Sequence, residues 1–402
     1  MKRGCRGGLL GLASAVLLLA GSPVAQAEVK FGALFPLSGG LALLGEESYR
    51  GVQLAVQEIN ANGGVQGEEV VLETGDAVDP NQAIAEARRL MSVENVRAIF
   101  GTYSSSRSIA ASQVAEIQGV PYFELGAVAD KITGRGFKYV HRTNPAAEQL
   151  GNMTIELITE VVAPKLGVEP QSLRIGIIHE DSNYGSSVSR HQIGKAEELG
   201  LNIVENEGYS ANTVDMSSIV LRLKESDVDV VLQTSYQNDS VLFLQQANEG
   251  GFAPEAIIGG GGGYSMQPTA DAVGHGVIQN VLDVDFTQFT VDDDAAPGNA
   301  AFVKAYKERF GSAPRSGHSL NHYVGAKAIL QAIDNADGFD SETIIQAAES
   351  IDIKKGETAA GYGIKFDETG QNARAFMMGF QWQEGKLITV YPPEFAMAEP
   401  GL

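Results

Sequence analysis

The stretch GTYSSSRSIAAS, residues 101–112, follows the apolar run AIF at 98–100 and is the best starting point for working out the fold. The apolar run is typical of the end of a strand, and the residues after it are typical of a helix. Backbone N–H groups are unpaired at such a helix start, and the helix dipole favours an anion there. The stretch therefore predicts either a ligand-binding turn around Tyr103, Ser104 and Ser105 or a serine that only caps the helix.

Expected strands and helices alternate on both sides of this stretch. The expected strands of the first series are residues 30–34, 69–73, 97–100 and 120–125. The expected helices between them are residues 48–62, 80–91 and 104–117. The same alternation restarts at residue 173 and continues to a strand at 256–258. This rhythm predicts an α/β fold of parallel βαβ units, and its restart predicts a second lobe.

Residues 1–27 are typical of an export signal. A positively charged start is followed by an apolar run at 9–20 and by the small-x-small sequence AQA at 25–27. We expect cleavage after residue 27 of the 402, which leaves 375 residues in the periplasm. The only cysteine, Cys5, leaves with this segment, so no disulfide or thiolate site is expected in the mature chain.

The charge of the chain excludes some classes of partner. The formal net charge of −21 becomes −24 once Lys2, Arg3 and Arg6 are removed with the signal segment. So acidic a chain is not expected to bind nucleic acid or an anionic membrane surface.

Motifs for catalysis and metal binding are absent from the sequence. It contains no G-x-S-x-G elbow, Walker loop or GxGxxG fingerprint. His318 and His322 stand four residues apart, but HSLNH lacks the glutamate of a zinc motif, so helix-surface or site-lining histidines are expected. The acidic run 292–294 lacks the spacing of a calcium loop. We therefore expect no enzyme, no cofactor and no metal.

A series of motifs then covers nearly all of the mature chain. They are FGALFPLSG (31–39), GEESYRGVQLAVQEINANGGVQG (45–67), DAVDPNQAIAEARRLM (76–91), IFGTYSSSRSIAAS (99–112), VPYFELGAVADKITGRGFKYVHRTNP (120–145), IGIIHEDSNYGSS (175–187), VDVVLQTSYQNDSVLFLQQANEGGF (228–252) and GYGIKFDETGQN (361–372). In this order they resemble the periplasmic leucine/isoleucine/valine-binding proteins, which are type I periplasmic solute-binding proteins of ABC transporters.

The resemblance implies two Rossmann-like lobes joined by three crossing segments, with a ligand cleft between the lobes. Lobe 1 would consist of residues 28–143 and 284–358, and lobe 2 of residues 144–283 and 359–402, with crossings near Thr143, Leu282 and Ala360. The implied function is capture of a small amino-acid-like or carboxylate ligand by hinge closure, for delivery by a monomer to an inner-membrane ABC permease. A periplasmic sensor for amides or aromatic acids and a secreted α/β enzyme are the alternatives.

The resemblance also implies a set of ligand-binding residues. They are Tyr103, Ser104, Ser105, Gly126, Ala127, Val128, Tyr184, Tyr236, Gly261 and Tyr264. Two positions depart from the family pattern: Val128 replaces a threonine, and glycines at 259–263 stand where an acidic residue would pair with the ligand ammonium. An ammonium buried without a carboxylate is costly. Either Glu46, Glu47, Glu124 or Asp285 replaces the acid, or the ligand is not an ordinary α-amino acid.

Two features near these positions leave alternatives open. Arg107 follows the serines and could neutralise an anionic ligand, or it could be a solvated or salt-bridged arginine. The glycine run 259–263 could allow close approach of a ligand to the backbone, or it could be a flexible loop.

Overall fold

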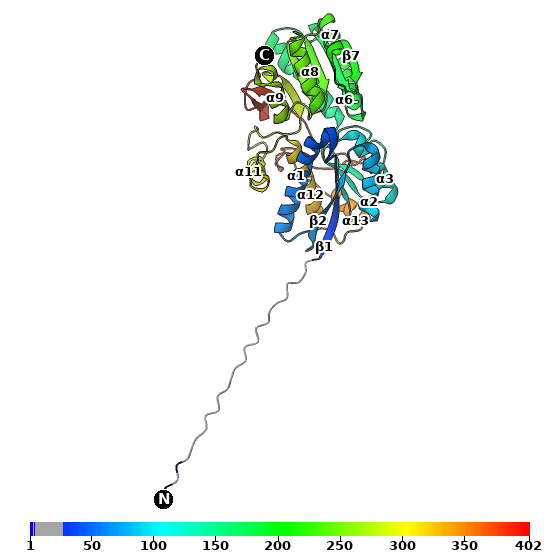
Figure 1. Ribbon diagram of the computed structural model, residues 1–402, viewed down its shortest axis with the longest axis vertical. Helices are drawn as coiled ribbons and strands as arrows, with labels where there is room; N and C mark the ends of the chain where they lie inside the picture. The colour runs from blue at the N-terminus through cyan, green and yellow to red at the C-terminus, as the bar shows by residue number, and fades with distance from the viewer. Residues whose placement is uncertain (3, 5–26) are drawn as a thin grey trace.

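Two β-sheets organise the chain, one in each half of the molecule (Figure 1). The computed structural model describes residues 1–2, 4 and 27–402, so most of the predicted export signal, with Cys5, lies outside the described residues. Within the described part, no helix is long and apolar enough to cross a membrane.

The first sheet has five parallel strands. Their order is β2 (Glu69–Asp76), β1 (Glu28–Phe35), β3 (Ile99–Gly101), β4 (Tyr122–Glu124) and β5 (Val140–Arg142). The connecting helices are η1 (Gly39–Leu41), α1 (Ala42–Ala61), α2 (Pro80–Ser92) and α3 (Ser105–Gln118). Asp79 caps α2 by accepting hydrogen bonds from the N–H groups of Asn81 and Gln82, and Pro80 occupies the first helical position. The predicted βαβ order of this half is confirmed.

The second sheet has seven strands. Their order is β12 (Lys386–Tyr391), β11 (Met378–Gln383), β10 (Leu282–Asp285), β9 (Ala256–Gly260), β8 (Val230–Thr234), β6 (Arg174–Glu180) and β7 (Asn202–Tyr209). Its helices are α4 (Ala147–Leu157), the π-turn Ile158–Val162, α5 (Ala163–Leu166), η3 (Pro170–Ser172), α6 (Asn183–Glu198), α7 (Ser217–Glu225), α8 (Gln237–Glu249), α9 (Gln267–Val273) and α10 (His275–Ile278). β11 runs antiparallel to both of its neighbours. The sequence Glu384-Gly385 predicts a hairpin turn, and β11 and β12 form this hairpin with both turn residues in the left-handed region.

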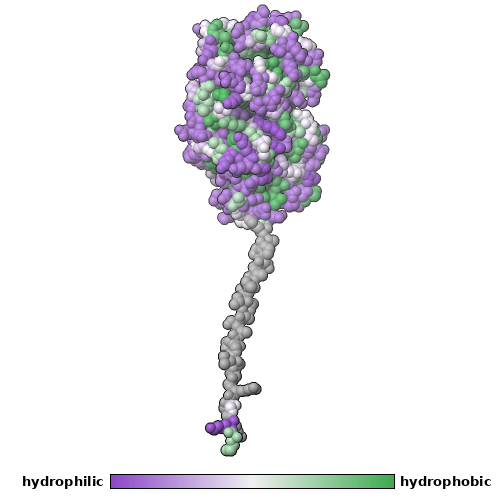
Figure 2. Space-filling model, turned by 60° about the vertical axis from the view of Figure 1, so that its left-hand side comes forward, coloured by the Kyte–Doolittle hydropathy of each residue, from purple (hydrophilic) through white to green (hydrophobic). Residues whose placement is uncertain are grey.

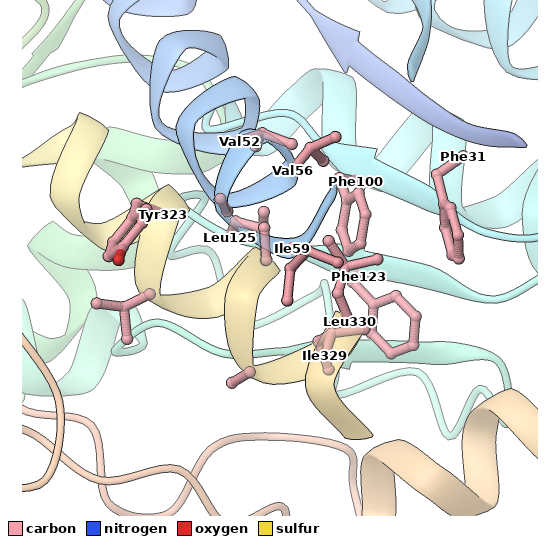
Figure 3. Close-up of a cluster of buried hydrophobic side chains, with 14 of the residues drawn as sticks. Phe31, Val52, Val56, Ile59, Phe100, Phe123, Leu125, Tyr323, Ile329 and Leu330 are labelled. Carbon is pink, nitrogen blue, oxygen red and sulfur yellow. The ribbon is translucent and has the colours of Figure 1, made fainter. Parts of the chain in front are cut away.

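Three later helices return to the first sheet. They are α11 (Asn299–Phe310), α12 (His318–Asp334) and α13 (Ser341–Glu349). Figure 3 shows α1 and α12 packed over the strands, with Val52 of α1 and Ile329 of α12 facing the rings of Phe100 and Phe123. All four side chains are buried, and each contributes about 1.5–3 kcal/mol to the hydrophobic stabilisation of this half.

The crossing segments differ in detail from the expected ones. The segment 137–144 contains β5, a fifth strand of the first sheet, before the chain crosses. Val284 pairs with Gly260 of β9, and Asp285 pairs with Met378 of β11, so the chain leaves the second sheet only after Asp285. The sequence GYGIKF at 361–366 predicts a short strand, but these residues make only isolated bridges, such as Ile353 with Ile364. The chain ends with η4 (Pro393–Phe395) and a tail beside the second sheet.

The surface is largely hydrophilic. Figure 2 shows polar residues spread over both halves on this face, with apolar residues scattered among them.

Candidate ligand-binding site

A pocket lies between the two halves, at the carboxyl ends of the strands of both sheets. This edge of an open α/β sheet is where small ligands bind. The lining residues are Leu44, Tyr103, Gly126, Val128, Leu150, Tyr184, Tyr236, Gly261, Gly262, Asp285, Phe286, His318 and Met377.

The carboxylate of Glu124 at the end of β4 holds two of the pocket loops in place. Its Oε2 accepts a hydrogen bond from the N–H of Thr102 (2.7 Å), and its Oε1 accepts from the N–H of Tyr103 (3.1 Å). The same Oε1 accepts from the N–H groups of Gly126 (2.9 Å) and Ala127 (2.7 Å). Burial raises the pKa of Glu124, while these donors oppose the rise. Glu124 is therefore committed to the protein and is not free to bind a ligand cation.

The start of α3 presents hydrogen-bond donors. The Ser104 hydroxyl oxygen accepts from Nη1 of Arg107 (3.1 Å), and the Ser105 hydroxyl oxygen accepts from the N–H of Ala129 (3.2 Å). Each serine therefore keeps its own hydroxyl hydrogen for another acceptor. Ser104 is the N-cap of α3, and its side chain makes no capping bond. These hydroxyls and the N–H groups of the first turn form a site suited to a carboxylate.

Arg107 is half-buried and does not line the pocket. Its Nε donates to the carbonyl of Ala77 at 2.7 Å, and its Nη2 donates to the carbonyl of Val78. Together with its bond to Ser104, this fixes the guanidinium behind the start of α3. There it adds positive charge to the end of the helix that faces the pocket.

Aromatic rings form much of the pocket wall. The rings of Tyr184 and Tyr236 lie 5.3 Å apart, and the ring of His318 lies 4.8 Å from Phe286 and 6.0 Å from Tyr103. Burial raises the pKa of the Tyr236 phenol, an effect partly offset by the Ser104 hydroxyl opposite it. With Leu44, Val128, Leu150 and Met377, these rings give the pocket apolar walls.

The sequence offers four carboxylates that could replace the acid missing after β9. The structure shows which of them are bound to other protein groups and which lines the pocket. Glu46 pairs with Arg50 (2.6 Å) and Arg315 (3.1 Å). Glu47 accepts from the Tyr306 hydroxyl (2.7 Å) and from the N–H of Arg315 (3.0 Å). Glu124 holds the loops. Asp285 is the one of the four that lines the pocket.

Asp285 lies at the last position of β10 and is 1 % exposed. Its Oδ2 accepts from the Ser265 hydroxyl at 2.5 Å, and its Oδ1 accepts from the N–H of Phe286 at 2.8 Å. Burial raises the pKa of Asp285 to about 7, against the lowering effect of these two donors. A carboxylate has about four acceptor positions, so each oxygen can still accept one more hydrogen bond.

Two buried histidines of α12 lie beside Asp285 and the loop after β4. Burial lowers the pKa of both His318 and His322 to about 3, so both rings are neutral at neutral pH. The contact of 3.8 Å between Nδ1 of His318 and Oδ2 of Asp285 is therefore not an ion pair. Nδ1 of His322 donates to the carbonyl of His318 at 2.7 Å, which leaves Nε2 as an acceptor.

The Nε2 atom of His322 has no hydrogen-bond partner within the part of the chain that the structure describes. It lies against Gly126, where a Cβ would come within 2.9 Å of it. Since Gly126 lines the pocket, this acceptor faces the pocket wall.

The structure brings together most of the residues predicted from the sequence. Tyr103, Gly126, Val128, Tyr184, Tyr236 and Gly261 line the pocket. Ser104, Ser105 and Ala127 lie in the turn and loop beside it. Tyr264 points elsewhere: it is fully buried against Trp382 and Leu244, and its hydroxyl bonds to Gln233. Of the four tyrosines among the predicted ligand-binding residues, Tyr103, Tyr184 and Tyr236 therefore lie at the pocket.

Other lining residues were not predicted. Leu44 lies in the first turn of α1, Leu150 lies in α4, and Met377 directly precedes β11. Phe286 could have been suspected, because it directly follows the strand that ends at Asp285. Nothing in the local sequence marks Met377, whose position depends on the pairing of β11 with β10.

Direct bonds connect the two halves beside the pocket. Asp130, in the loop after β4, accepts from Nη2 of Arg190 (2.7 Å) and contacts Nε2 of His191 (2.9 Å), both on α6. Its N–H donates to the Ser187 hydroxyl (3.1 Å). Nδ2 of Asn183 donates to the Ser106 hydroxyl at 3.2 Å. The two halves are therefore in contact across the pocket.

Comparison with known proteins shows which family the chain belongs to. A sequence profile described as periplasmic binding protein matches residues 28–386. A Leu/Ile/Val-binding protein homolog 8 of Brucella abortus (strain 2308) is 61% identical over 375 residues, which cover 93% of each chain.

Two solved structures share the fold. The leucine-binding protein LivK of Thermotoga maritima superposes with a TM-score of 0.79 at 24% identity, covering 90% of this chain and 97% of LivK. The branched-chain amino acid binding protein LivJ of Streptococcus pneumoniae, in complex with isoleucine, gives a TM-score of 0.77 at 22% identity, covering 90% and 97%. The chain belongs to the periplasmic binding protein family and has the type I fold of that family.

Proposed function

We propose that this protein is the solute-binding subunit of an ABC importer for a branched-chain amino acid. The observation that carries the proposal is the pocket itself, in which the donors at the start of α3 face apolar walls. A carboxylate would bind at the hydroxyls of Ser104 and Ser105 and the first N–H groups of α3. The aliphatic side chain would lie among Leu44, Val128 and the neighbouring apolar residues.

The relatives support the choice of ligand class. The Brucella homologues carry the name Leu/Ile/Val-binding, and at about 60% identity they match this chain over almost its full length. The apolar walls of the pocket suit a leucine, isoleucine or valine side chain better than a charged one, because burying an unpaired charge is costly.

Capture would take place by closure of the two lobes over the ligand. In this proposal lobe 1 consists of residues 28–143 and 286–358, and lobe 2 of residues 144–285 and 359–402. This moves the middle boundary of the predicted division to the end of β10. Ligand contacts from both lobes would stabilise the closed state relative to an open one. The protein would be exported by its first 27 residues and would act in the periplasm as a monomer that docks on an inner-membrane permease.

A thermal-shift and calorimetry screen tests this function. The chain from Glu28 onward is tested against L-leucine, L-isoleucine, L-valine, benzoate, urea and acetamide. At one hundred times its dissociation constant a ligand adds about 2.7 kcal/mol to the free energy of unfolding, which raises the melting temperature by several degrees. A shift with the branched-chain amino acids supports the proposal. A shift only with benzoate, urea or acetamide transfers the protein to another ligand class.

A further inference from the structure

One side of the pocket carries hydrogen-bond donors and another side carries hydrogen-bond acceptors. The proposed function assigns no role to the acceptors. The donor side is the start of α3. Across the pocket, at the end of β10, Asp285 is a buried acceptor. Buried acceptors without enough donors are costly, which points to a ligand that brings donors of its own.

Asp285 lies close to the glycine run after β9. In the parallel pairing of β9 with β10, Asp283 lies beside Gly259 and Val284 beside Gly260. The N–H of Gly261 donates to the carbonyl of Val284 at 2.8 Å, so the register continues and places Asp285 next to Gly261. The carboxylate therefore comes from the neighbouring strand and reaches the same corner of the pocket.

His318 connects the two sides of the pocket. Its ring lies 6.0 Å from the ring of Tyr103, which immediately precedes the serines of α3. Its Nδ1 lies 3.8 Å from Asp285. Tyr103, beside the donor side, and Asp285, on the acceptor side, therefore border the same pocket, with the ring of His318 next to both.

We propose that Asp285 binds the ammonium group of an amino-acid ligand whose carboxylate occupies the start of α3, an inference that rests on the proposed function. Of the carboxylates compared above, Asp285 lines the pocket and keeps acceptor capacity on both oxygens. It therefore determines that the ligand is an amino acid and not a plain carboxylic acid.

The charges around Asp285 predict a second measurable effect, the release of a proton when the ligand binds. The titratable groups that face Asp285 are Asp283 on its own strand, His318 of α12 and the Tyr184 phenol of α6. None of them is a cation at neutral pH, and burial raises the pKa of Asp285 to about 7. The ammonium of a ligand would be the first positive charge at this carboxylate. Binding at pH 6 should therefore expel the proton from Asp285.

Calorimetry with matched ligands and variants tests the inference. The wild-type protein, Asp285→Asn and Asp283→Asn are titrated with L-leucine and with 4-methylpentanoate, which is leucine without its amino group. Asp283 is the matched control because it is buried on the same face of β10 but does not line the pocket. Each titration at pH 6 is repeated in two buffers of different ionisation enthalpy, which counts the protons released.

The expected result is a loss of about 100-fold in L-leucine affinity for Asp285→Asn, with 4-methylpentanoate changed less than about 3-fold. Asp283→Asn should bind L-leucine within about 3-fold of the wild type. The wild type should release close to one proton per L-leucine and Asp285→Asn none. If Asp285→Asn does not fold, the number of protons that the wild type releases per bound L-leucine tests the inference alone. Zero release at pH 6 overturns it.

Other outcomes distinguish the inference from the function it rests on. If Asp285→Asn binds L-leucine as tightly as the wild type, the assignment of Asp285 is overturned and the binding function stands. The same holds if the wild type prefers 4-methylpentanoate to L-leucine. If the wild type binds neither these two ligands nor any compound of the screen above, the proposed function fails as well.

Discussion

Tyr184 donates its hydroxyl hydrogen to the carbonyl oxygen of Gly260, which ties the start of α6 to the end of β9. The bond brings the phenol oxygen against the next residue, Gly261, where a Cβ would overlap it. Gly261 also has a φ of +94°, which a residue with a Cβ rarely adopts. The backbone at this corner therefore leaves room only for glycine, and a carboxylate has to reach the corner from another strand.

Replacing Gly261 by alanine should weaken both the fold and ligand binding. The added Cβ must displace the Tyr184 hydroxyl and adopt an unfavourable φ, so we expect the free energy of unfolding to fall by about 1–3 kcal/mol. Denaturant unfolding and calorimetry with L-leucine measure the two effects. Gly276→Ala in α10 is the control, because nothing lies within 4 Å of its Cβ position. When Gly261→Ala is combined with Tyr184→Phe, the loss in the free energy of unfolding should be smaller than the sum of the two single losses.

Glu124→Gln should destabilise the first lobe. The glutamine amide loses one acceptor oxygen, so backbone N–H groups among those of Thr102, Tyr103, Gly126 and Ala127 lose their partner. An unsatisfied buried donor costs about 1–3 kcal/mol, and the free energy of unfolding should fall by that amount. The exposed Glu197→Gln should change it by less than about 0.5 kcal/mol. An unchanged melting temperature for Glu124→Gln would show that this carboxylate does not hold the loops.

Asp130→Ala should shorten the lifetime of the closed state. The bonds of its carboxylate to Arg190 and His191 join the two lobes, but these partners are partly exposed, so each bond is worth well under 1 kcal/mol. We expect ligand dissociation to become about 3-fold faster, with a smaller difference at high salt. Stopped-flow release of L-leucine measures the rate. Lys195→Ala is the control, since Lys195 pairs with Glu198 within α6; an equal effect there would argue against the interlobe contact.

His322→Asn should make the fold less sensitive to acid. Burial lowers the pKa of His322 from 6.5 to about 3, so between these values the unfolded chain binds a proton that the folded chain does not. Stability then falls as the pH falls from about 6.5 to about 3, by up to ~1.4 kcal/mol per pH unit for one histidine. The asparagine amide can still donate to the carbonyl of His318, but it does not titrate.

The measurement for this prediction is the difference in the free energy of unfolding between wild type and variant at several pH values. The difference cancels the opposing contributions of buried acids such as Asp239, whose pKa burial raises to about 7. The exposed His275→Asn is the control. A wild type and a His322→Asn variant with parallel pH curves would contradict the buried neutral state of this ring.

The sequence determined the architecture because it depends on local patterns. Alternating strands and helices, with glycines and prolines between them, predict parallel βαβ units from residue 30 onward, and the restart at residue 173 predicts the second sheet. The turn at 101–112 was also recognisable, because a strand end followed by serines at a helix start is a local feature. Tyr103 belongs to this turn, whereas Tyr184 and Tyr236 were implied by the resemblance to the family, which has aromatic residues after the matching strands.

Only the tertiary structure decided which of these groups meet and what each can still bind. Glu124 and Asp285 are both acids at strand ends. The carboxylate of Glu124 accepts hydrogen bonds from backbone N–H groups of two loops, whereas the carboxylate of Asp285 lines the pocket. Tyr264 follows the glycine run as expected, yet its side chain packs against Trp382 because the backbone there turns it away from the pocket. Met377 reaches the pocket through an antiparallel pairing far along the chain. Hydrogen-bond partners and burial depend on contacts distant in sequence, and these decide which side chains remain free for a ligand.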